Sequence, residues 1–380
     1  MGLTQTLAWG TTYYLPAILA NNMAAELGIA TPWIFTAFSA GLLLSAFLGP
    51  ASGRLIDVHG GRRVLPVSNL LIAAGLALLG FSSGMVSLFA AWLVMGLGMS
   101  CGLYEAAFST LAGIYGRDAR RAITGITLIA GFASTVCWPL SAYMDVTIGW
   151  RATCFAWAAA HLIVALPLNL LLPPGRRHEP ANASGAHEAS RKRRVPVMAG
   201  LSFVFAAAWF GSTAMAAHLP RVLQEAGATL AVAVAASALV GPAQVAARLL
   251  EFWLMRHVHP IVSARIASLA HPLAATGLIA AGAPAATLFA VVHGAGNGVM
   301  TIAVGTLPLA LFGAAGYGLR QGLLMAPARL LSASAPFVFD LLLARYGTYA
   351  LTVTAGFGLA AFTVLMLLPV ERQRQSRTIS

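Results

Sequence analysis

The stretch GPASGRLIDVHGGRR, from Gly49 to Arg63, separates two long apolar runs and decides what kind of fold the chain adopts. It places the acid Asp57 and three arginines in a corner flanked by glycines, which let a backbone reverse tightly and let helices approach closely. A related stretch, GPAQVAARLLEFWLMRHVHP from Gly241 to Pro260, has the same Gly-Pro-Ala opening and carries the acid Glu251. Matching the Arg-Leu-x-acid cores aligns the two acids, whereas matching the loop corners puts Glu251 more than a turn inside a helix. We interpret the two stretches as one device used twice.

The composition excludes a water-soluble globule. Hydrophobic residues make up 59% of the 380 residues, charged residues only 9%, and the mean hydropathy is +0.80, so a bilayer is the expected environment. Twelve apolar segments are long enough to cross it, which predicts an all-α membrane protein of twelve transmembrane helices. They are Gln5–Leu27, Trp33–Ile56, Val64–Ser82, Met85–Tyr115, Ala119–Tyr143, Ala152–Leu172, Val197–Leu219, Leu230–Met255, Ile261–Ala281, Ala285–Phe312, Gln321–Ala344 and Tyr349–Pro369.

The basic residues indicate the orientation of these helices. The net charge is +12, but most of the 23 lysines and arginines fall in alternate loops, on the side of both termini. The positive-inside rule then places both termini in the cytoplasm, and we expect a multi-pass protein of a bacterial-type inner membrane without a nucleic-acid partner. The first span lacks a basic leader and a cleavage site, so we expect it to be retained. The three cysteines fall inside spans and predict no disulfide framework.

A single long polar segment divides the chain into two halves. We predict a six-helix bundle over residues 1–172, a cytoplasmic linker over 173–196, a second six-helix bundle over 197–370 and a cytoplasmic tail over 371–380. Internal similarity supports the division: Gly96–Gly116 parallels Gly294–Gly313, and the Trp9 region parallels the Trp209 region. Two parallel six-helix repeats are the layout of rocking-bundle transporters, whose solute site lies between the halves near mid-bilayer.

The run from Gly53 through Asp57 to Gly61-Arg62-Arg63 closely resembles the loop motif of the major facilitator superfamily, and Gly149-Trp150-Arg151 resembles a second motif of that family. The resemblance implies that Asp57 engages the start of span eleven, near Gly318 to Gln321, and locks a cytoplasmic gate. We assign Arg62 and Glu251 to the same gating function. The alternative is a simple turn held by positive charge. Span five, with GFASTVCWPL, lacks the Gly-Pro and paired glycines of many drug/proton antiporters.

Three ionisable residues lie deep inside spans, where each charge is costly to insert. Arg248, Arg329 and Glu105 lie about 12 to 15 Å from the nearest helix end at about 1.5 Å per residue. The two arginines resemble those of the monocarboxylate-porter and oxalate/formate-exchanger branches, which implies that they bind a substrate carboxylate; Gln244 stands where the porters have an acid. The alternatives are an i, i+3 ion pair between Arg248 and Glu251 and a structural partner for Arg329. Glu105 could carry a coupling proton or neutralise an arginine.

Polar residues at helical spacing predict the walls of the solute cavity. His293, Asn297 and Thr301 repeat every four residues in span ten, Ser100 and Tyr104 do so in span four, and span one offers Thr12 and Tyr13. The alternative is that these side chains are hidden in helix contacts. His161 and His271, on outer-type spans, are interpreted as structural histidines.

These observations together predict a monomeric secondary transporter that moves a small organic anion, a mono- or dicarboxylate, by alternating access, with proton coupling left open. The substrate-binding candidates are Arg248, Arg329, Tyr13, Tyr104, His293 and Asn297, and Glu105 is the proton-coupling candidate. The alternative function is an efflux antiporter for a drug-like or metalloid compound, and a membrane sensor is a further one. No nucleophile–base pair and no His-Glu-x-x-His motif occurs, so we expect no enzyme activity, no metal and no cofactor.

Overall fold

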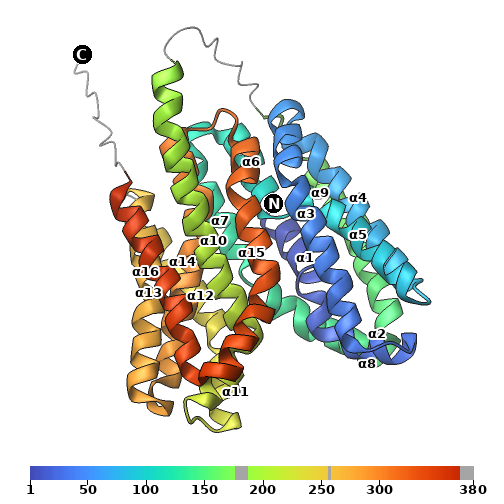
Figure 1. Cartoon of the computed structure of the whole chain (residues 1–380). Helices are drawn as coiled ribbons and strands as arrows, with labels where there is room; N and C mark the ends of the chain where they lie inside the picture. Colours follow the sequence, from blue (N-terminus) through green and yellow to red (C-terminus); the bar gives the residue numbers. More distant parts are fainter. Residues whose placement is uncertain (176–186, 256–257, 369–380) are drawn as a thin grey trace.

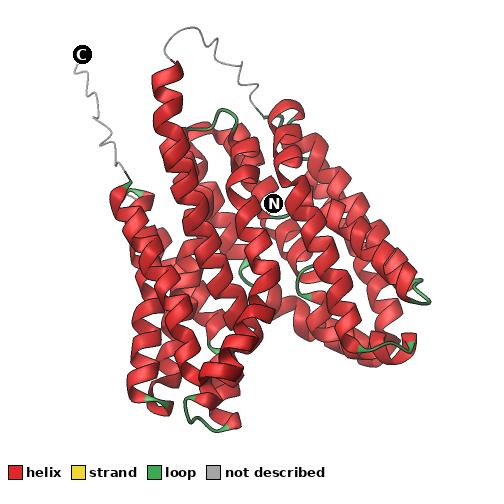
Figure 2. Cartoon of the chain, in the orientation of Figure 1, coloured by secondary structure: helices red, strands yellow, loops and turns green. Residues whose placement is uncertain are grey.

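A computed structural model describes residues 1–175, 187–255 and 258–368, and these residues form helices and connecting loops without a strand (Figure 2). Within them, nine helices are long and apolar enough to cross a membrane. Two of the nine, Ala119–Leu170 and Tyr317–Leu367, contain 52 and 51 residues, enough for two crossings each of a core about 30 Å thick. The helices before Thr31 are too short for that criterion. The count of twelve crossings stays a prediction that this arrangement fits.

The helices form two bundles (Figure 1). The first contains α1 (Gly2–Thr11), α2 (Leu15–Leu27), α3 (Thr31–His59), α4 (Gly61–Gly80), α5 (Met85–Gly102), α6 (Tyr104–Tyr115), η1 (Gly116–Asp118), α7 (Ala119–Ala130), α8 (Ala133–Ala160), η2 (His161–Ala165) and α9 (Leu166–Leu170). The second contains α10 (His187–Glu225), α11 (Leu230–Ala238), α12 (Val240–Leu254), α13 (Pro260–Ala281), η3 (Ala283–Ala285), α14 (Ala286–Phe312), α15 (Tyr317–Tyr346), η4 (Gly347–Ala350) and α16 (Leu351–Leu367).

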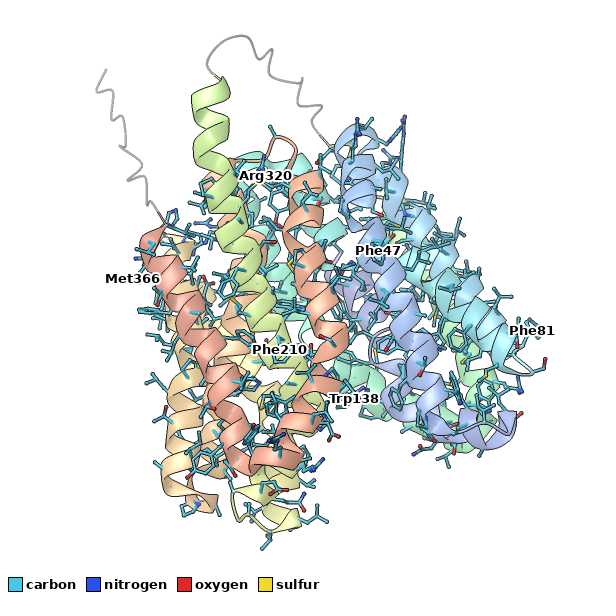
Figure 3. All side chains as sticks on the ribbon, in the orientation of Figure 1. Phe47, Phe81, Trp138, Phe210, Arg320 and Met366 are labelled. Atoms are coloured by element: carbon cyan, nitrogen blue, oxygen red, sulfur yellow. The ribbon has the colours of Figure 1, made fainter. Side chains whose placement is uncertain are left out.

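Each bundle has its own apolar core. Trp92 is fully buried in the core of the first, and Phe205 and Phe289 belong to two clusters in the second. Large apolar side chains also cover the outside of the protein, among them Phe47 and Phe81, which are 70% and 74% exposed (Figure 3). Exposed apolar residues over so much of the surface fit a lipid environment.

The two bundles lie close together at one end and diverge toward the other (Figure 1). We call the first the linker end; it carries the turns at Gly60, Gly116 and Gly313. The opposite, or far, end carries the turns at Gly28 and Gly282. The predicted tail, and much of the predicted linker, fall outside the described residues.

Several spans that the hydropathy pattern makes continuous are broken at mid-depth. The predicted span Met85–Tyr115 breaks at Leu103, whose backbone is extended (φ −84°, ψ −169°), so that a new helix, α6, begins at Tyr104. Gln5 donates its side-chain amide to the Gly102 carbonyl that the break leaves open, at 2.7 Å. Glu105 therefore lies in the first turn of a helix, where the helix dipole favours a carboxylate. Helices also end and restart between α1 and α2, between α7 and α8, and between α11 and α12, without an extended residue such as Leu103.

Candidate functional site

Arg329 and Glu105 form an ion pair between the bundles at mid-depth. Nη2 of Arg329, on α15, lies 2.6 Å from Oε2 of Glu105 on α6, and the side chains are 16% and 17% exposed. Nη1 of the same arginine donates to the hydroxyl and carbonyl oxygens of Ser45 on α3, at 2.7 and 3.1 Å. Of the two alternatives for Glu105, this geometry favours charge neutralisation, because its carboxylate lies in direct contact with the Arg329 guanidinium.

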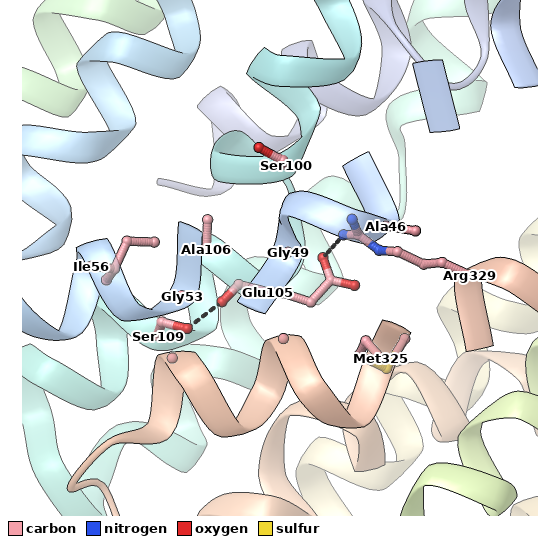
Figure 4. A pocket seen from close by; sticks show the side chains of 12 residues that line it. Ala46, Gly49, Gly53, Ile56, Ser100, Glu105, Ala106, Ser109, Met325 and Arg329 are labelled. Atoms are coloured by element: carbon pink, nitrogen blue, oxygen red, sulfur yellow. Dashed lines mark hydrogen bonds and ion pairs between the residues drawn. The ribbon is translucent and has the colours of Figure 1, made fainter. Parts of the chain in front are cut away.

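A small pocket extends from this pair toward the linker end (Figure 4). Ser100 and Ser109 line it, together with small residues of α3 and α15. Ser109 donates to the backbone carbonyl of Glu105 at 2.6 Å, and the Ser52 and Ser100 hydroxyls are 3.0 Å apart. The hydroxyls of Ser52, Ser100 and Ser109 therefore lie between Glu105 and the linker end.

Arg248, the second deep arginine, has no such partner. It is 5% exposed, and its three nitrogens donate to uncharged oxygens: the Gly298 carbonyl at 3.3 Å, the Thr301 hydroxyl at 3.4 Å and, across the bundle interface, the Thr127 carbonyl at 3.1 Å. No carboxylate of the described residues bonds to it. The expected alternative, an ion pair with Glu251, is not formed, because Glu251 bonds to Arg120 instead. The guanidinium lies against Gly131, where an added Cβ would meet Nη1 at 2.4 Å.

Aromatic side chains of the first bundle gather beside the two arginines. The Trp9 ring lies 5.2 Å from Tyr13 and 4.9 Å from Tyr104 between centroids. Tyr104 and Tyr14 are within electrostatic range of Arg248, and Tyr13 is within range of Arg329 and beside Thr213 of the second bundle. Two predicted site residues, Tyr13 and Tyr104, thus lie at the interface with the predicted arginines.

The other two predicted side chains lie elsewhere. His293 and Asn297 line a pocket inside the second bundle, between α10, α13, α14 and α16. Thr301, one turn further along α14, is the member of that stripe that contacts Arg248. Residues four apart on a helix lie on nearly the same face. The polar residues of α14 therefore run from Thr301 at the bundle interface to Asn297 and His293 inside the second bundle.

Asp57 bonds to the start of α15, as the motif implies. Its two carboxylate oxygens accept from the backbone amides of Gly318 and Leu319, at 2.8 and 2.9 Å. The first turn of a helix has free amides and a partial positive charge, which suit an anion. Gly53 makes the approach possible, since an added Cβ there would lie 2.0 Å from the Gly318 carbonyl oxygen.

Glu251 makes the corresponding contact in the second bundle. Its Oε1 lies 3.2 Å from Nη2 of Arg120, at the start of α7, and Arg120 also donates to the Val258 and Met255 carbonyls at 2.6 and 2.9 Å. His259 begins the next helix by accepting from the Ile261 amide, which requires an unprotonated nitrogen. The pKa of His259 is lowered, first by burial and then by the nearby charges of Arg120 and Arg265. Arg62, the remaining gating candidate, is exposed near the start of α4.

The sequence of the chain matches one known protein family over most of its length. A family model, the major facilitator superfamily, matches residues 1–287. The chain belongs to the major facilitator superfamily. It is therefore a secondary transporter of small solutes, a multi-pass membrane protein of the kind that the sequence predicted.

Solved structures of other major facilitators have the same fold. The human organic anion transporter MFSD10 (TETRAN) is 16% identical over 96% of each chain, with a TM-score of 0.71. The proton:xylose symporter XylE, bound to 6-bromo-6-deoxy-D-glucose, is 14% identical over 97% of this chain and 95% of its own, with a TM-score of 0.75. The E. coli fucose:proton symporter FucP is 16% identical over 95% and 97%, with a TM-score of 0.69. Identities this low establish the fold alone.

Sequence reasoning did not find several residues of the site. The loop position of Arg120 indicates only a charge that sets the orientation of the helices, and Thr127 and Gly131 lie in a predicted span without a polar stripe. Gly131, at the break between α7 and α8, is a usable signal in the sequence. Glycine in an apolar span often permits another side chain or helix to approach closely. Within the described residues, no group of three or more His, Cys, Asp or Glu side chains could hold a metal ion.

Proposed function

We propose that this major facilitator transports a small monocarboxylate, which binds to Arg248 between the two bundles. The observation that carries the proposal is the charge balance at mid-depth. Arg329 and Glu105 neutralise each other, whereas Arg248 has only uncharged partners among the described residues. The interface therefore has one positive charge in excess, and a buried charge without a counter-ion is strongly unfavourable. One carboxylate of the solute would supply the missing charge.

The surroundings of Arg248 support a carboxylate in particular. A guanidinium offers a planar fork of donors that matches two carboxylate oxygens, and its present bonds of 3.1 to 3.4 Å to neutral oxygens are exchangeable. The tyrosines and Trp9 nearby offer apolar ring surface for the rest of the solute. MFSD10, which has a similar fold, is an organic anion transporter. In this scheme Arg329 and Glu105 hold the bundles together beside the solute.

We also infer the topology and the state of the transporter. The linker end, with its arginines, is the cytoplasmic one under the positive-inside rule, which leaves both termini in the cytoplasm. The boundaries after residues 172, 196 and 370 separate the bundles from the linker and the tail, and the transporter works as a monomer in a bacterial-type inner membrane. Asp57 and Glu251 join the bundles at the linker end, whereas the far-end ion pairs Glu26–Arg151 and Arg221–Asp340 stay within one bundle. These contacts favour an outward-facing state.

A solute panel on purified protein in lipid nanodiscs tests the proposal. The probes are acetate, lactate and benzoate as monocarboxylates, oxalate and succinate as dicarboxylates, glucose as a neutral solute and tetraphenylphosphonium as a drug-like cation. We expect a monocarboxylate to raise the unfolding temperature, because a ligand stabilises the state that it binds. Dicarboxylates should bind more weakly, since their second charge has no partner.

Substitutions at Arg248 connect the binding to the proposed site. A hydrogen bond to a charged group contributes about 1.5–3 kcal/mol, so Arg248→Lys should weaken binding roughly 10- to 100-fold, and Arg248→Gln should abolish it. Arg265→Gln is the matched control, because Arg265 donates to the Leu365 carbonyl away from the interface. Undiminished monocarboxylate binding by Arg248→Gln, or stabilisation by glucose or the cation instead, would overturn the proposal.

A further inference from the structure

Two histidines face each other inside the second bundle. Nδ1 of His271, on α13, lies 3.0 Å from Nδ1 of His293 on α14, and Nε2 of His271 lies 2.8 Å from the Thr354 hydroxyl on α16. The ring centroids of the two histidines are 4.9 Å apart. Both ring nitrogens of His271 therefore have a partner, and one of the two partners, His293, is itself titratable.

The hydrogen bonds fix where the protons lie when both rings are neutral. The Thr354 hydroxyl donates to the Leu351 carbonyl at 3.0 Å, so it accepts from Nε2–H of His271. Nδ1 of His271 then carries no hydrogen and accepts from Nδ1–H of His293. Nε2 of His293 is left with a lone pair and no hydrogen-bond partner among the described residues.

The hydrogen bonds of the neutral pair are the same ones that a protonated pair would make. A proton from water that adds to Nε2 of His293 makes that ring an imidazolium, while its Nδ1–H continues to donate to His271. No existing bond breaks, and the N–H···N bond becomes charge-assisted and stronger. Phe289 stacks on His293, with centroids 5.9 Å apart and planes 7° from parallel, so its ring face can also stabilise the cation.

The pocket around the pair is suited to this role. Ser212 of α10, Ser268 of α13, Asn297 of α14 and Thr354 of α16 supply its polar groups. Among the described residues that line it, the two imidazoles are the only titratable groups. The fixed charges of these helices, such as Arg265 on α13 and Arg221 on α10, are not among the residues that line the pocket.

The deep acids are already committed to other contacts. Glu105 pairs with Arg329 and Glu251 with Arg120. His161, the buried histidine of the first bundle, contacts the neutral groups of Thr11 and Asn69 and has no second imidazole beside it. The His271–His293 pair therefore combines a vacant basic nitrogen, an acceptor for the shared proton and a pocket.

We propose that the His271–His293 pair is the site at which the transporter binds its coupling proton. The proposal rests on the proposed transport function, but the proton site can be measured without a solute. Proton uptake would occur at Nε2 of His293, and the charge would be shared with His271 across the Nδ1–Nδ1 bond.

Histidine-selective NMR of the protein in nanodiscs, between pH 5 and 8, tests proton binding directly. We expect the signals of His271 and His293 to move together with one midpoint, with free imidazole in the sample as the reference. His271→Gln should lower the midpoint of His293, because the acceptor of the charge-assisted bond is lost. His161→Gln is the matched control and should leave that midpoint unchanged. A pair that stays neutral down to pH 5 overturns the proposal.

Proteoliposomes test the coupling. With a pH-sensitive dye inside, a solute gradient should drive proton movement in the wild type, and His293→Gln should abolish it while solute exchange continues. Continued proton movement in His293→Gln overturns the coupling role. If no panel carboxylate binds and yet the NMR titration is present, the proposed substrate fails and the proton site stands.

Discussion

The close contact between α3 and α15 at the linker end provides a sharp test of the outward-facing assignment. An added Cβ at Gly53 would lie 2.0 Å from the Gly318 carbonyl oxygen, whereas ordinary contact begins at 3.4 Å. Gly53→Ala should therefore force the helices apart by roughly 1.4 Å. The two bonds from Asp57 to α15, now 2.8 and 2.9 Å, would become too long to be hydrogen bonds. We expect the substitution to open the linker end.

The size of the effect follows from the cost of overpacking, about 1–3 kcal/mol. If this strain acts only on the state with the linker end closed, the ratio of closed to open molecules falls roughly 5- to 150-fold. The rest of each bundle keeps its own core, so folding and membrane insertion should continue. The substitution is therefore expected to change the conformational equilibrium more than the stability of the fold.

Spin labels on the far end measure this equilibrium. Ser83 and Thr352 lie at the far ends of the first and second bundles, both are exposed, and the three native cysteines are buried. Distances between labels at these two positions should become shorter in Gly53→Ala. Gly49→Ala is the matched control, one helical turn earlier on α3, where an added Cβ meets nothing within 4 Å. Equal distance distributions for the wild type and both variants would refute the reasoning.

Three further substitutions test individual contacts. Asp57→Asn should leave expression normal but lower the initial uptake rate, because a neutral amide holds α15 less firmly; wild-type turnover would contradict the gating role. Gly131→Ala should displace the nearby guanidinium and weaken carboxylate binding by about tenfold in calorimetry, while Gly125→Ala, where an added Cβ meets nothing within 4 Å, should not. Glu105→Gln should lower the unfolding temperature, since breaking a buried pair costs on the order of 3 kcal/mol, and adding Arg329→Gln should recover part of the loss; an additive loss would contradict the pairing.

Much of the fold could be predicted from the sequence because apolar length and loop charge constrain a membrane protein strongly. The turn at Gly60 separates α3 from α4 as the opening stretch indicated. The contact of Asp57 with the start of α15 was also accessible, because the motif specifies both the acid and the helix that receives it. Both inferences rest on local pattern.

The partners of the deep charges could not be predicted in the same way. Spacing along α12 suggested Glu251 for Arg248, yet Glu251 bonds to Arg120, 131 residues away in sequence and in the other bundle. The break at Leu103 was equally hidden, since a short extended segment inside an apolar run leaves hydropathy unchanged. The sequence alone indicates a structural histidine at position 271, because no pattern in it pairs spans nine and ten.

Arg248 also explains how a solute could drive the conformational cycle. A ligand shifts an equilibrium only if it binds the two states differently. In this structure Nη1 of Arg248 donates to the Thr127 carbonyl of the other bundle, at 3.1 Å. A carboxylate that binds the guanidinium would replace that hydrogen bond. The bond from Arg329 to Glu105, at 2.6 Å and between full charges, should persist. We therefore expect a bound monocarboxylate to change the distance between labels at Ser83 and Thr352, and a carboxylate that binds through Arg248 without changing it would refute this coupling.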